Sequence, residues 1–311
     1  MHTPLELRLD RKTQTQLLIL NLIRQSGGIS RIDLAAKLGL TKSAMTVLTN
    51  EMIDEGLLNE KEEIPQGQQK RGRRKVLLQI EPSCRLAFGA VIGNGTLSVG
   101  LTDLSGASLE RRSLSTADMT YRDILGAIAE LTQAMLKENY IPQKSVLGIG
   151  VAVEDRAADL IEGATGSEKL LRLKRDLAHG LNLPIVTVRA AAGALLAQRL
   201  FFGENVKNAL LLHVDGRTAE VAMLTDGRVY SGSQNMLSFA CRDIDPLKLA
   251  GDYIRLLRPE KIYLSGIGFS EETAQPITGV PTQYTDLEGR NRHLCGCAAA
   301  VERLFYLDSS L

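Results

Sequence analysis

The sequence lacks any long run of apolar residues. Its longest apolar stretches, Leu17 to Leu20 and Ala190 to Ala197, are far shorter than the roughly 18 residues that a membrane-spanning helix needs. It does not open with the charged and then apolar segment of an export signal. Its four cysteines are too few for a disulfide framework in a chain of 311 residues. These absences predict a cytoplasmic protein with no membrane partner.

Apolar residues are nevertheless abundant, and positive charge is concentrated at one end of the chain. At 44% hydrophobic, the 311 residues are enough for two or three domains with cores of their own. Residues 1–80 contain 13 Lys and Arg against nine Asp and Glu, whereas the remaining residues contain 24 against 27. The positive end favours a partner that carries phosphate groups.

Residues 11–55 have the pattern of three short helices. Apolar residues recur at helical spacing in three segments, and glycines separate these segments. Ser30 stands as the N-cap of the second helix, which stops at Gly39, and Thr41 stands as the N-cap of the third. Two short helices joined by a tight turn predict a helix-turn-helix, whose second helix enters the major groove of DNA.

The outward face of the third helix supplies candidate contacts to bases. Met45, Leu48 and Met52 are predicted to face inward, which leaves small polar and basic side chains outside. The amide of Asn50 is able to pair bidentately with adenine, but Asn50 is equally interpreted as an ordinary solvent-facing residue. The predicted DNA contacts of this motif are Arg31, Thr41, Lys42, Ser43, Thr46 and Asn50.

A basic loop between two predicted strands completes a winged helix. The strands are predicted at residues 57–60 and 75–80, and residues 64–75 contain no acidic side chain. An Arg-Gly-Arg segment can insert its guanidinium groups into a narrow minor groove, which would make the loop a wing. A solvated run of charge is the alternative. The predicted DNA contacts of the loop are Lys70, Arg71, Gly72, Arg73 and Arg74.

After Pro82, predicted strands and helices alternate. Strands are predicted at residues 86–92, 96–102, 108–113, 146–153, 185–188 and 261–265, with a strand-rich stretch at 210–224. Helices are predicted at residues 121–138, 170–181, 190–201, 246–257 and 296–307. The alternation predicts an α/β domain over residues 84–311, in two lobes with their boundary near residues 186–200.

The order of these elements, together with several local strings, resembles the ROK family, which joins sugar kinases and sugar-responsive repressors. The strings are LTKS (40–43), EGLL (55–58), GRR (72–74), LTDLSG (101–106), GIGVAV (148–153), DGRVYSG (226–232) and LRPEKI (257–262). They span nearly the whole chain. The resemblance implies an α/β fold in which an N-terminal winged helix-turn-helix, residues 1–80, precedes a two-lobed actin/hexokinase-like (ribonuclease H-like) domain.

The same resemblance points to kinase residues that this chain lacks. The first strand of ROK kinases ends in Asp-x-Gly-Gly-Thr, which wraps the nucleotide phosphates, but Val91 stands where the Asp belongs. Their catalytic Asp follows a Leu-Pro-Val strand, and Ala190 occupies that position here. Without a carboxylate there, no group takes the proton of the sugar hydroxyl as it attacks phosphorus.

Three further departures from the kinase pattern agree with this. The second phosphate loop, Gly-Thr-Gly-Ile-Gly in the family, corresponds to residues 216–220, where Glu220 introduces a negative charge. The sugar-binding Glu and the metal-binding His of the family are absent from residues 237–242, and the cysteine-rich zinc loop is missing before Pro246. These losses predict a protein that is not an enzyme and binds no cofactor.

Two clusters remain as candidate sites for small ligands. The spacing of His293, Cys295 and Cys297 suits soft metal ligands, for which Cys241 would be a fourth. Because small cysteines also pack well at the start of a helix, the prediction is no metal. The second cluster lies near the cleft of the family and forms a candidate anion-preferring pocket for a phosphorylated or acidic sugar, unless its arginines are plain surface residues. It consists of Arg189, Gln234 and Arg242.

The sequence thus predicts a sequence-specific transcriptional regulator of the repressor type. Its non-catalytic domain is expected to form a homodimer or higher homo-oligomer that presents winged helices to double-stranded DNA, and to be open to a small-molecule effector. One alternative is a ROK-type sugar kinase with an attached DNA-binding head. Another is a protein-interaction scaffold with a vestigial winged helix, because the ROK recognition helix often has Arg where this chain has Val47.

Overall fold

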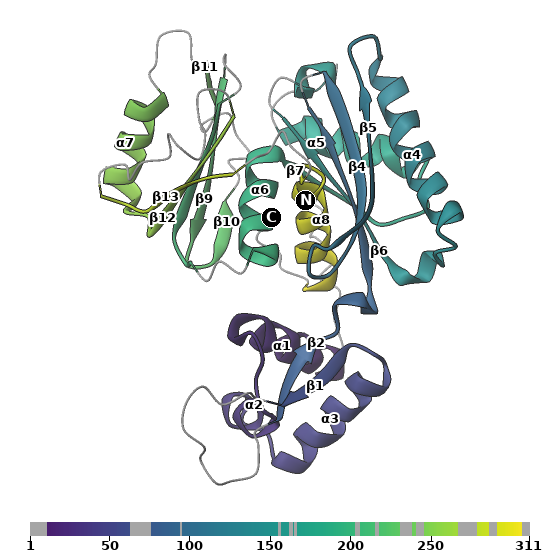
Figure 1. Ribbon diagram of the computed structural model, residues 1–311, viewed down its shortest axis with the longest axis vertical. Coiled ribbons are helices and arrows are strands. Elements are labelled where there is room, and N and C mark those ends of the chain that lie inside the picture. The colour runs from purple at the N-terminus through teal and green to yellow at the C-terminus, as the bar shows by residue number, and fades with distance from the viewer. Residues whose placement is uncertain are drawn as a thin grey trace, which may run out of the picture. The chain divides into compact units, whose positions relative to one another are not determined.

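The computed structural model of the protein divides into two compact units. They comprise Met1–Cys84 and Arg85–Leu311, and their helices and strands are labelled in Figure 1. The residues that the structure describes are 11–62, 76–93, 95–154, 157–161, 164, 167–202, 206–214, 218–230, 238–240, 246–266, 279–285 and 291–306. No helix within these ranges combines the length and the apolar character that crossing a bilayer requires.

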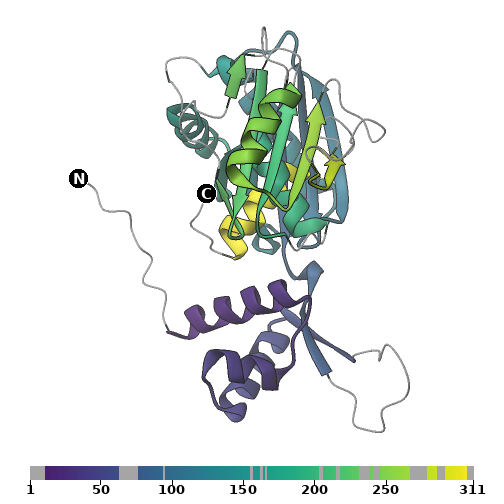
Figure 2. The same cartoon turned by 90° about the vertical axis from the view of Figure 1, so that its left-hand side faces the viewer.

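The described part of the first unit consists of three helices and an antiparallel strand pair (Figure 2). The elements are α1 (Arg11–Ser26), α2 (Arg31–Leu38), α3 (Lys42–Asp54), β1 (Leu58–Glu62) and β2 (Val76–Ile80). The two strands pair along their whole length, and Ile29 forms an isolated bridge to Leu78 of β2. The predicted helix-turn-helix with its strand pair is therefore confirmed as a fold.

The turn between α2 and α3 is defined by capping residues. The Ser30 hydroxyl oxygen accepts a hydrogen bond from the backbone N–H of Asp33 at 3.2 Å, and the Thr41 hydroxyl oxygen accepts one from Ala44 at 3.2 Å. Gly39 follows α2 with a φ of 65°, a left-handed conformation that glycine adopts without strain. The local sequence signals for the start and end of these helices are thus realised.

Apolar residues from all three helices and both strands are buried in the first unit. Met45 and Met52 of α3 are fully buried, as predicted, whereas Leu48 is only partly buried. Thr49, on the same helix, is also fully buried. Its hydroxyl tolerates burial because it donates a hydrogen bond to the carbonyl oxygen of Met45 at 2.9 Å. The other buried apolar residues are Ile19, Leu20, Ile23, Ile29, Leu34, Ala35, Leu58 and Leu78.

The second unit begins with a five-stranded mixed sheet in the order β5-β4-β3-β6-β7. The strands are β3 (Leu86–Ile92), β4 (Thr96–Asp103), β5 (Ser108–Ser115), β6 (Val146–Val153) and β7 (Ile185–Arg189). Strands β3, β4 and β5 are antiparallel neighbours, whereas β6 and β7 run parallel to β3. Two helices, α4 (Tyr121–Glu138) and α5 (Ser167–Ala178), pack on one face of this sheet.

A second sheet repeats this arrangement in the order β10-β9-β8-β12-β13, with β11 paired to β9. Its strands are β8 (Ala209–Val214), β9 (Thr218–Thr225), β10 (Arg228–Tyr230), β11 (Ser238–Ala240), β12 (Lys261–Gly266) and β13 (Thr282–Tyr284). Again the first three are antiparallel and the last two run parallel to the central strand. Helix α7 (Pro246–Leu257) packs on its outer face (Figure 1). The repeated topology confirms the predicted two-lobed fold.

Two helices lie side by side between the sheets, α6 (Ala190–Phe201) and α8 (Leu294–Ala300) (Figure 1). Helix α8 lies close against β3 and β6, since a Cβ atom added to Gly150 would collide with the backbone of Gly296. The chain continues from α8 into a π-helical turn, Val301–Phe305. Short 3-10 turns elsewhere comprise Pro82–Cys84, Gln143–Ser145 and Ala157–Leu160.

The predicted bounds of two helices were wrong. Helix α5 begins at Ser167 rather than residue 170, and α8 ends at Ala300 rather than residue 307. Helix α5 ends at Ala178 rather than residue 181, because the chain turns at Gly180, whose N–H donates to the carbonyl oxygen of Leu177 at 3.0 Å. The last helix begins before residue 296, because the N–H of Cys297 already donates to the carbonyl oxygen of His293 at 3.1 Å. These last two boundaries depend on the turn of the chain that adjoins them rather than on helical periodicity.

Candidate functional site

The outer face of α3 is polar and open to solvent. Lys42, Ser43, Thr46 and Asn50 are all exposed, as is the N-cap Thr41. The Thr46 hydroxyl donates to the carbonyl oxygen of Lys42 at 2.9 Å, so that its own oxygen still presents lone pairs to a ligand. No acidic residue lies in the first two turns of the helix. This face therefore offers one cation and several small polar groups, the composition that a major-groove contact requires.

Val47 interrupts this polar surface with an apolar side chain. It is 58% exposed and lies on α3 between Thr46 and Leu48. Valine cannot donate to a guanine or a phosphate, as arginine at this position would. Its methyl groups are able instead to contact the methyl group of a thymine. The chemistry available at this position is thus different from that of a recognition helix with arginine there.

Arg31, at the start of α2, is held by three partners. Its Nε donates to the Thr49 hydroxyl oxygen at 3.0 Å, and its Nη2 donates to Oδ1 of Asn50 at 2.9 Å. Its Nη1 forms an ion pair with the carboxylate of Glu60 on β1. Two predicted DNA contacts, Arg31 and Asn50, therefore touch one another. Sequence reasoning missed the other two members, because no local pattern connects residue 31 with residues 49 and 60.

The predicted contacts of the basic loop lie outside the described residues. These are Lys70, Arg71, Gly72, Arg73 and Arg74. On either side of the loop, Glu62 of β1 stands directly opposite Val76 of β2. The two strand ends that flank residues 63–75 are therefore adjacent.

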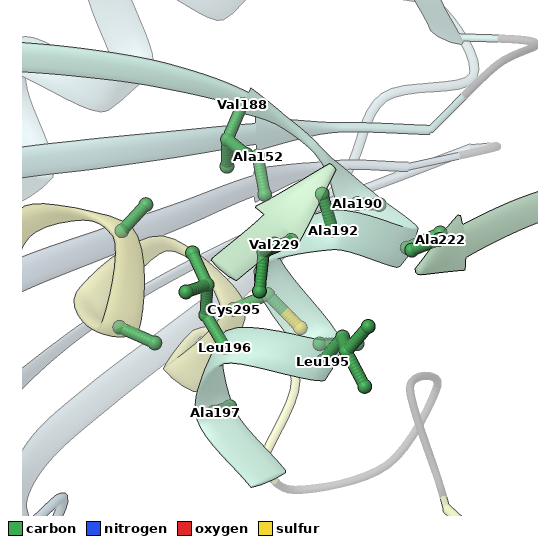
Figure 3. Close-up of a cluster of buried hydrophobic side chains, with 14 of the residues drawn as sticks. Ala152, Val188, Ala190, Ala192, Leu195, Leu196, Ala197, Ala222, Val229 and Cys295 are labelled. Atoms are coloured by element: carbon green, nitrogen blue, oxygen red, sulfur yellow. The ribbon is translucent and has the colours of Figure 1, made fainter. Parts of the chain in front are cut away.

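In the second unit, the two positions at which ROK kinases carry carboxylates lie among apolar side chains. Val91 is 1% exposed and Ala190 is 2% exposed, and both belong to the core around α6. Figure 3 shows Ala190 with Val188 and Ala192 in this core. Neither Val91 nor Ala190 carries a group that can accept a proton or hold a metal ion.

The predicted small-ligand cluster is described only in part. Arg189 is half-buried at the end of β7 and directly precedes α6. Gln234 and Arg242 lie outside the described residues. Glu220 of β9 is buried and accepts a hydrogen bond from the backbone N–H of Ala191, in the first turn of α6, at 3.4 Å. A carboxylate thus stands at the positive end of this helix, where an anionic ligand would otherwise be favoured.

A buried ion pair that the sequence did not indicate lies at the turn between β3 and β4. Arg292 and Glu154 are 8% and 6% exposed, and their side chains form an ion pair. Arg292 also donates to the hydroxyl of Thr96. A Cβ atom added to Gly93 would collide with the guanidinium group. Arg292 therefore fills the space over the turn that in ROK kinases wraps the nucleotide phosphates.

The His-x-Cys-x-Cys segment is packed inside the second unit. His293, Cys295 and Cys297 are 1%, 3% and 0% exposed. Burial raises the pKa of both thiols to about 12, which keeps them protonated and disfavours metal binding. Within the described residues, no three side chains of the metal-binding kind come together. Cys241, the suggested fourth ligand, lies outside those residues.

Comparison with known proteins finds a family match within the first unit and relatives that align with about 70% of the chain. Residues 12–62 match the MarR family. The chain is 27% identical over 232 residues to a putative xylose repressor of Caldicellulosiruptor sp. (strain Rt8B.4), covering 72% of this chain and 56% of that protein. It is 23% identical over 228 residues to the xylose repressor of Bacillus spizizenii, covering 71% and 58%. The chain therefore spans little more than half the length of these relatives.

Solved structures share the fold. A ROK family transcriptional regulator, described as a homolog of the E. coli MLC protein, superposes with a TM-score of 0.66 at 18% identity, covering 95% of this chain and 97% of that one. A ROK hexokinase from Thermus thermophilus superposes with a TM-score of 0.50 at 13% identity, covering 70% and 98%. Residues 12–62 of the chain match the MarR family, and the chain shares the fold of ROK proteins, so the predicted resemblance of its fold to the ROK family is confirmed.

Proposed function

We propose that the protein is a sequence-specific DNA-binding transcriptional repressor. Residues 1–80 would form its DNA-binding domain, and residues 84–311 a non-catalytic ROK-like domain for dimerisation and ligand sensing. The observation that carries this proposal is the exposed polar and basic face of α3 on a helix-turn-helix framework, at Lys42, Ser43 and Thr46. The names of the relatives, which are xylose repressors, support the same function.

In DNA binding, contacts to the phosphates would position the protein, and contacts to the bases would select the sequence. Lys42 at the start of α3 is suited to a phosphate or to the O6 and N7 atoms of guanine, and Ser43 and Thr46 to base edges. Arg71 and Arg73 in the wing would enter an adjacent minor groove. A two-fold dimer would present two such heads to half-sites separated by about one helical turn or more.

A kinase function is disfavoured by the centre of the second unit. Phosphoryl transfer needs a base for the attacking hydroxyl, and Ala190 supplies none. It also needs room for phosphates at the turn after β3, where Arg292 is packed over Gly93 and paired with Glu154. A coupled assay with ATP and a panel of sugars is therefore expected to give no turnover, and measurable turnover would restore the kinase alternative.

A sugar-derived or anionic effector fits the ancestry of the second unit. Arg189 is half-buried at the end of β7 and, with Gln234 and Arg242, forms the proposed anion-preferring cluster. Binding that closes the two lobes would change the spacing of the DNA heads, a coupling of about 1–3 kcal/mol. A thermal-shift screen with xylose, phosphorylated sugars and acidic sugars tests this. An unchanged melting temperature with every compound would remove the sensing role.

The decisive experiment is selection of genomic fragments by the purified protein at two salt concentrations. An Arg71→Ala/Arg73→Ala variant tests the wing, and Lys144→Ala/Lys174→Ala removes the same charge from exposed positions of the second unit as a control. We expect selective retention of a few fragments that weakens steeply with salt, is lost in the wing variant and is kept in the control. Retention without preference, or none, would favour the scaffold alternative.

A further inference from the structure

Arg31 makes contacts that a phosphate-binding arginine would not need. Its guanidinium reaches α3 through the hydroxyl of Thr49 and Oδ1 of Asn50, at 3.0 and 2.9 Å, and β1 through Glu60. Only 23% of its side chain is exposed. Arg31 itself belongs to α2. One side chain therefore ties together the two helices of the helix-turn-helix and the first strand of the wing.

The charge of Arg31 is already balanced. Glu60 of β1 supplies one negative charge to the guanidinium. The planar fork of arginine sends Nε, Nη1 and Nη2 to separate acceptors, which the single ammonium group of lysine cannot do. A phosphate approaching Arg31 would also meet the carboxylate of Glu60, so the pair contributes little net charge to DNA binding.

The same contact restricts what Asn50 can read. Bidentate pairing with adenine requires Oδ1 of the asparagine to accept from the N6 amino group while Nδ2 donates to N7. Oδ1 of Asn50 instead faces Arg31 and accepts its N–H. With Oδ1 held at Arg31, the amide nitrogen is the group of this exposed residue best placed for a base, and it can only donate.

We propose that Arg31 is a positioning residue of the DNA-binding domain and not a phosphate contact. It holds α3 against α2 and β1, and it orients Asn50 so that the amide nitrogen donates to an acceptor on the purine edge, N7 or the O6 of guanine. Thr49 and Glu60 complete the arrangement from α3 and β1. This inference rests on the proposed function and names the base chemistry that the same site would recognise.

The test measures affinity, salt dependence and base preference on an operator selected by the wild-type protein. Arg31→Lys keeps the charge but loses the fork. Because lysine binds phosphate well, a phosphate contact would survive this change. For a positioning residue we expect affinity to fall about tenfold or more, with relaxed base preference at one position of each half-site and an unchanged salt slope.

A charge-neutral pair of substitutions separates the two roles further. Arg31→Met/Glu60→Gln removes one positive and one negative charge. If Arg31 is a positioning residue, the salt slope stays as in the wild type while base preference relaxes. If it contacts phosphate, the slope becomes shallower by about 0.9 per half-site. Lys42→Ala serves as the matched control, since an exposed lysine at the start of α3 is expected to change the slope.

The orientation of Asn50 has a variant of its own. Asn50→Asp keeps an acceptor for Arg31 but removes the donor, so we expect loss of the preference for a purine acceptor with little change in thermal unfolding. Wild-type base preference in Arg31→Lys, or in Asn50→Asp, would overturn this inference alone. A wild-type protein that selects no DNA fragment would overturn the proposed function and this inference with it.

Discussion

The outer face of α3 in the first unit and the centre of the second unit place their charged groups in opposite ways. In the first unit, Lys42 stands on an exposed helix face beside small polar residues. At the centre of the second unit, oppositely charged side chains are paired and buried. The side chains of Arg292 and Glu154 are 9% and 8% exposed. A second pair, Arg199 of α6 and Glu302 of the π-helical turn, has side chains that are 15% and 1% exposed.

This difference separates a surface suited to binding from a centre suited to holding segments together. An exposed cation exchanges water for a ligand at little cost, and its contribution weakens with salt. A buried ion whose partner is removed is left uncompensated in a medium of low polarity, which is strongly destabilising. The turn after β3, which wraps the nucleotide phosphates in ROK kinases, holds segments together in this chain, because Arg292 contacts Thr96 and Glu154 there.

The largest expected effect comes from breaking the buried pair. Arg292→Ala leaves the carboxylate of Glu154 buried without its cation, and we expect a loss of about 3–5 kcal/mol in the free energy of unfolding, measured with urea. Arg112, whose pKa is raised by its hydrogen bonds to Glu138 and Glu110 at the surface, offers the contrast. Arg112→Ala should leave stability nearly unchanged. Equal losses in the two variants would erase the distinction between buried and exposed charge.

The next effect concerns the close contact of α8 with the sheet. A methyl group added at Gly150 meets the backbone of Gly296, whereas one added at Gly126 of α4 meets nothing within 4 Å. Gly150→Ala is expected to destabilise the protein by about 1–3 kcal/mol or more. Gly126→Ala should stabilise it by about 0.5–1 kcal/mol, because alanine favours a helix interior. Thermal unfolding checks both variants: the melting temperature should fall for Gly150→Ala and rise for Gly126→Ala.

A smaller effect is expected from the caps of the first unit. Thr41→Ala removes the acceptor for the N–H of Ala44 and should cost about 0.5–2 kcal/mol in stability. Thr41→Ser keeps the acceptor and serves as the control. The loss should appear as faster amide exchange at the start of α3, without change in the second unit. Exchange that quickened equally in both units would mean that they do not unfold separately.

The smallest effect at neutral pH comes from the ionisation of two buried thiols. Because burial raises the pKa of Cys295 and Cys297 to about 12, the folded state holds these thiol protons more tightly than the unfolded chain, whose thiols have the ordinary value of 9.0. Their contribution to stability is complete below pH 9 and is lost between about 9 and 12.

Alkylation measures the same protection. At pH 8, iodoacetamide should modify the half-buried Cys84 well before Cys295 or Cys297, as judged by mass spectrometry of the peptides. In urea the three thiols should react alike, which controls for intrinsic reactivity. Rapid modification of Cys295 in the folded protein would show that the centre of the second unit opens readily.

Local signals in the sequence were enough to place most elements. The predicted bounds of β3, β6, α4, α6 and α7 coincide with those of the structure, since each is a continuous apolar run or a helically periodic segment. Ser30 and Thr41 also cap helices as predicted, because capping depends on residues three positions apart. The DNA-binding roles assigned to the outer face of α3 and to the wing stay predictions.

What the sequence by itself determined is the helix-turn-helix, the alternation of strands and helices, and the absence of carboxylates at positions 91 and 190, all of which are local. Tertiary structure alone decided the partners of Arg31 and Arg292, because Glu60 and Glu154 lie far from them along the chain. Opposite charges outside a helical or strand repeat carry no periodic signal. Only the folded chain shows which of them meet, and whether they meet in water or in the core.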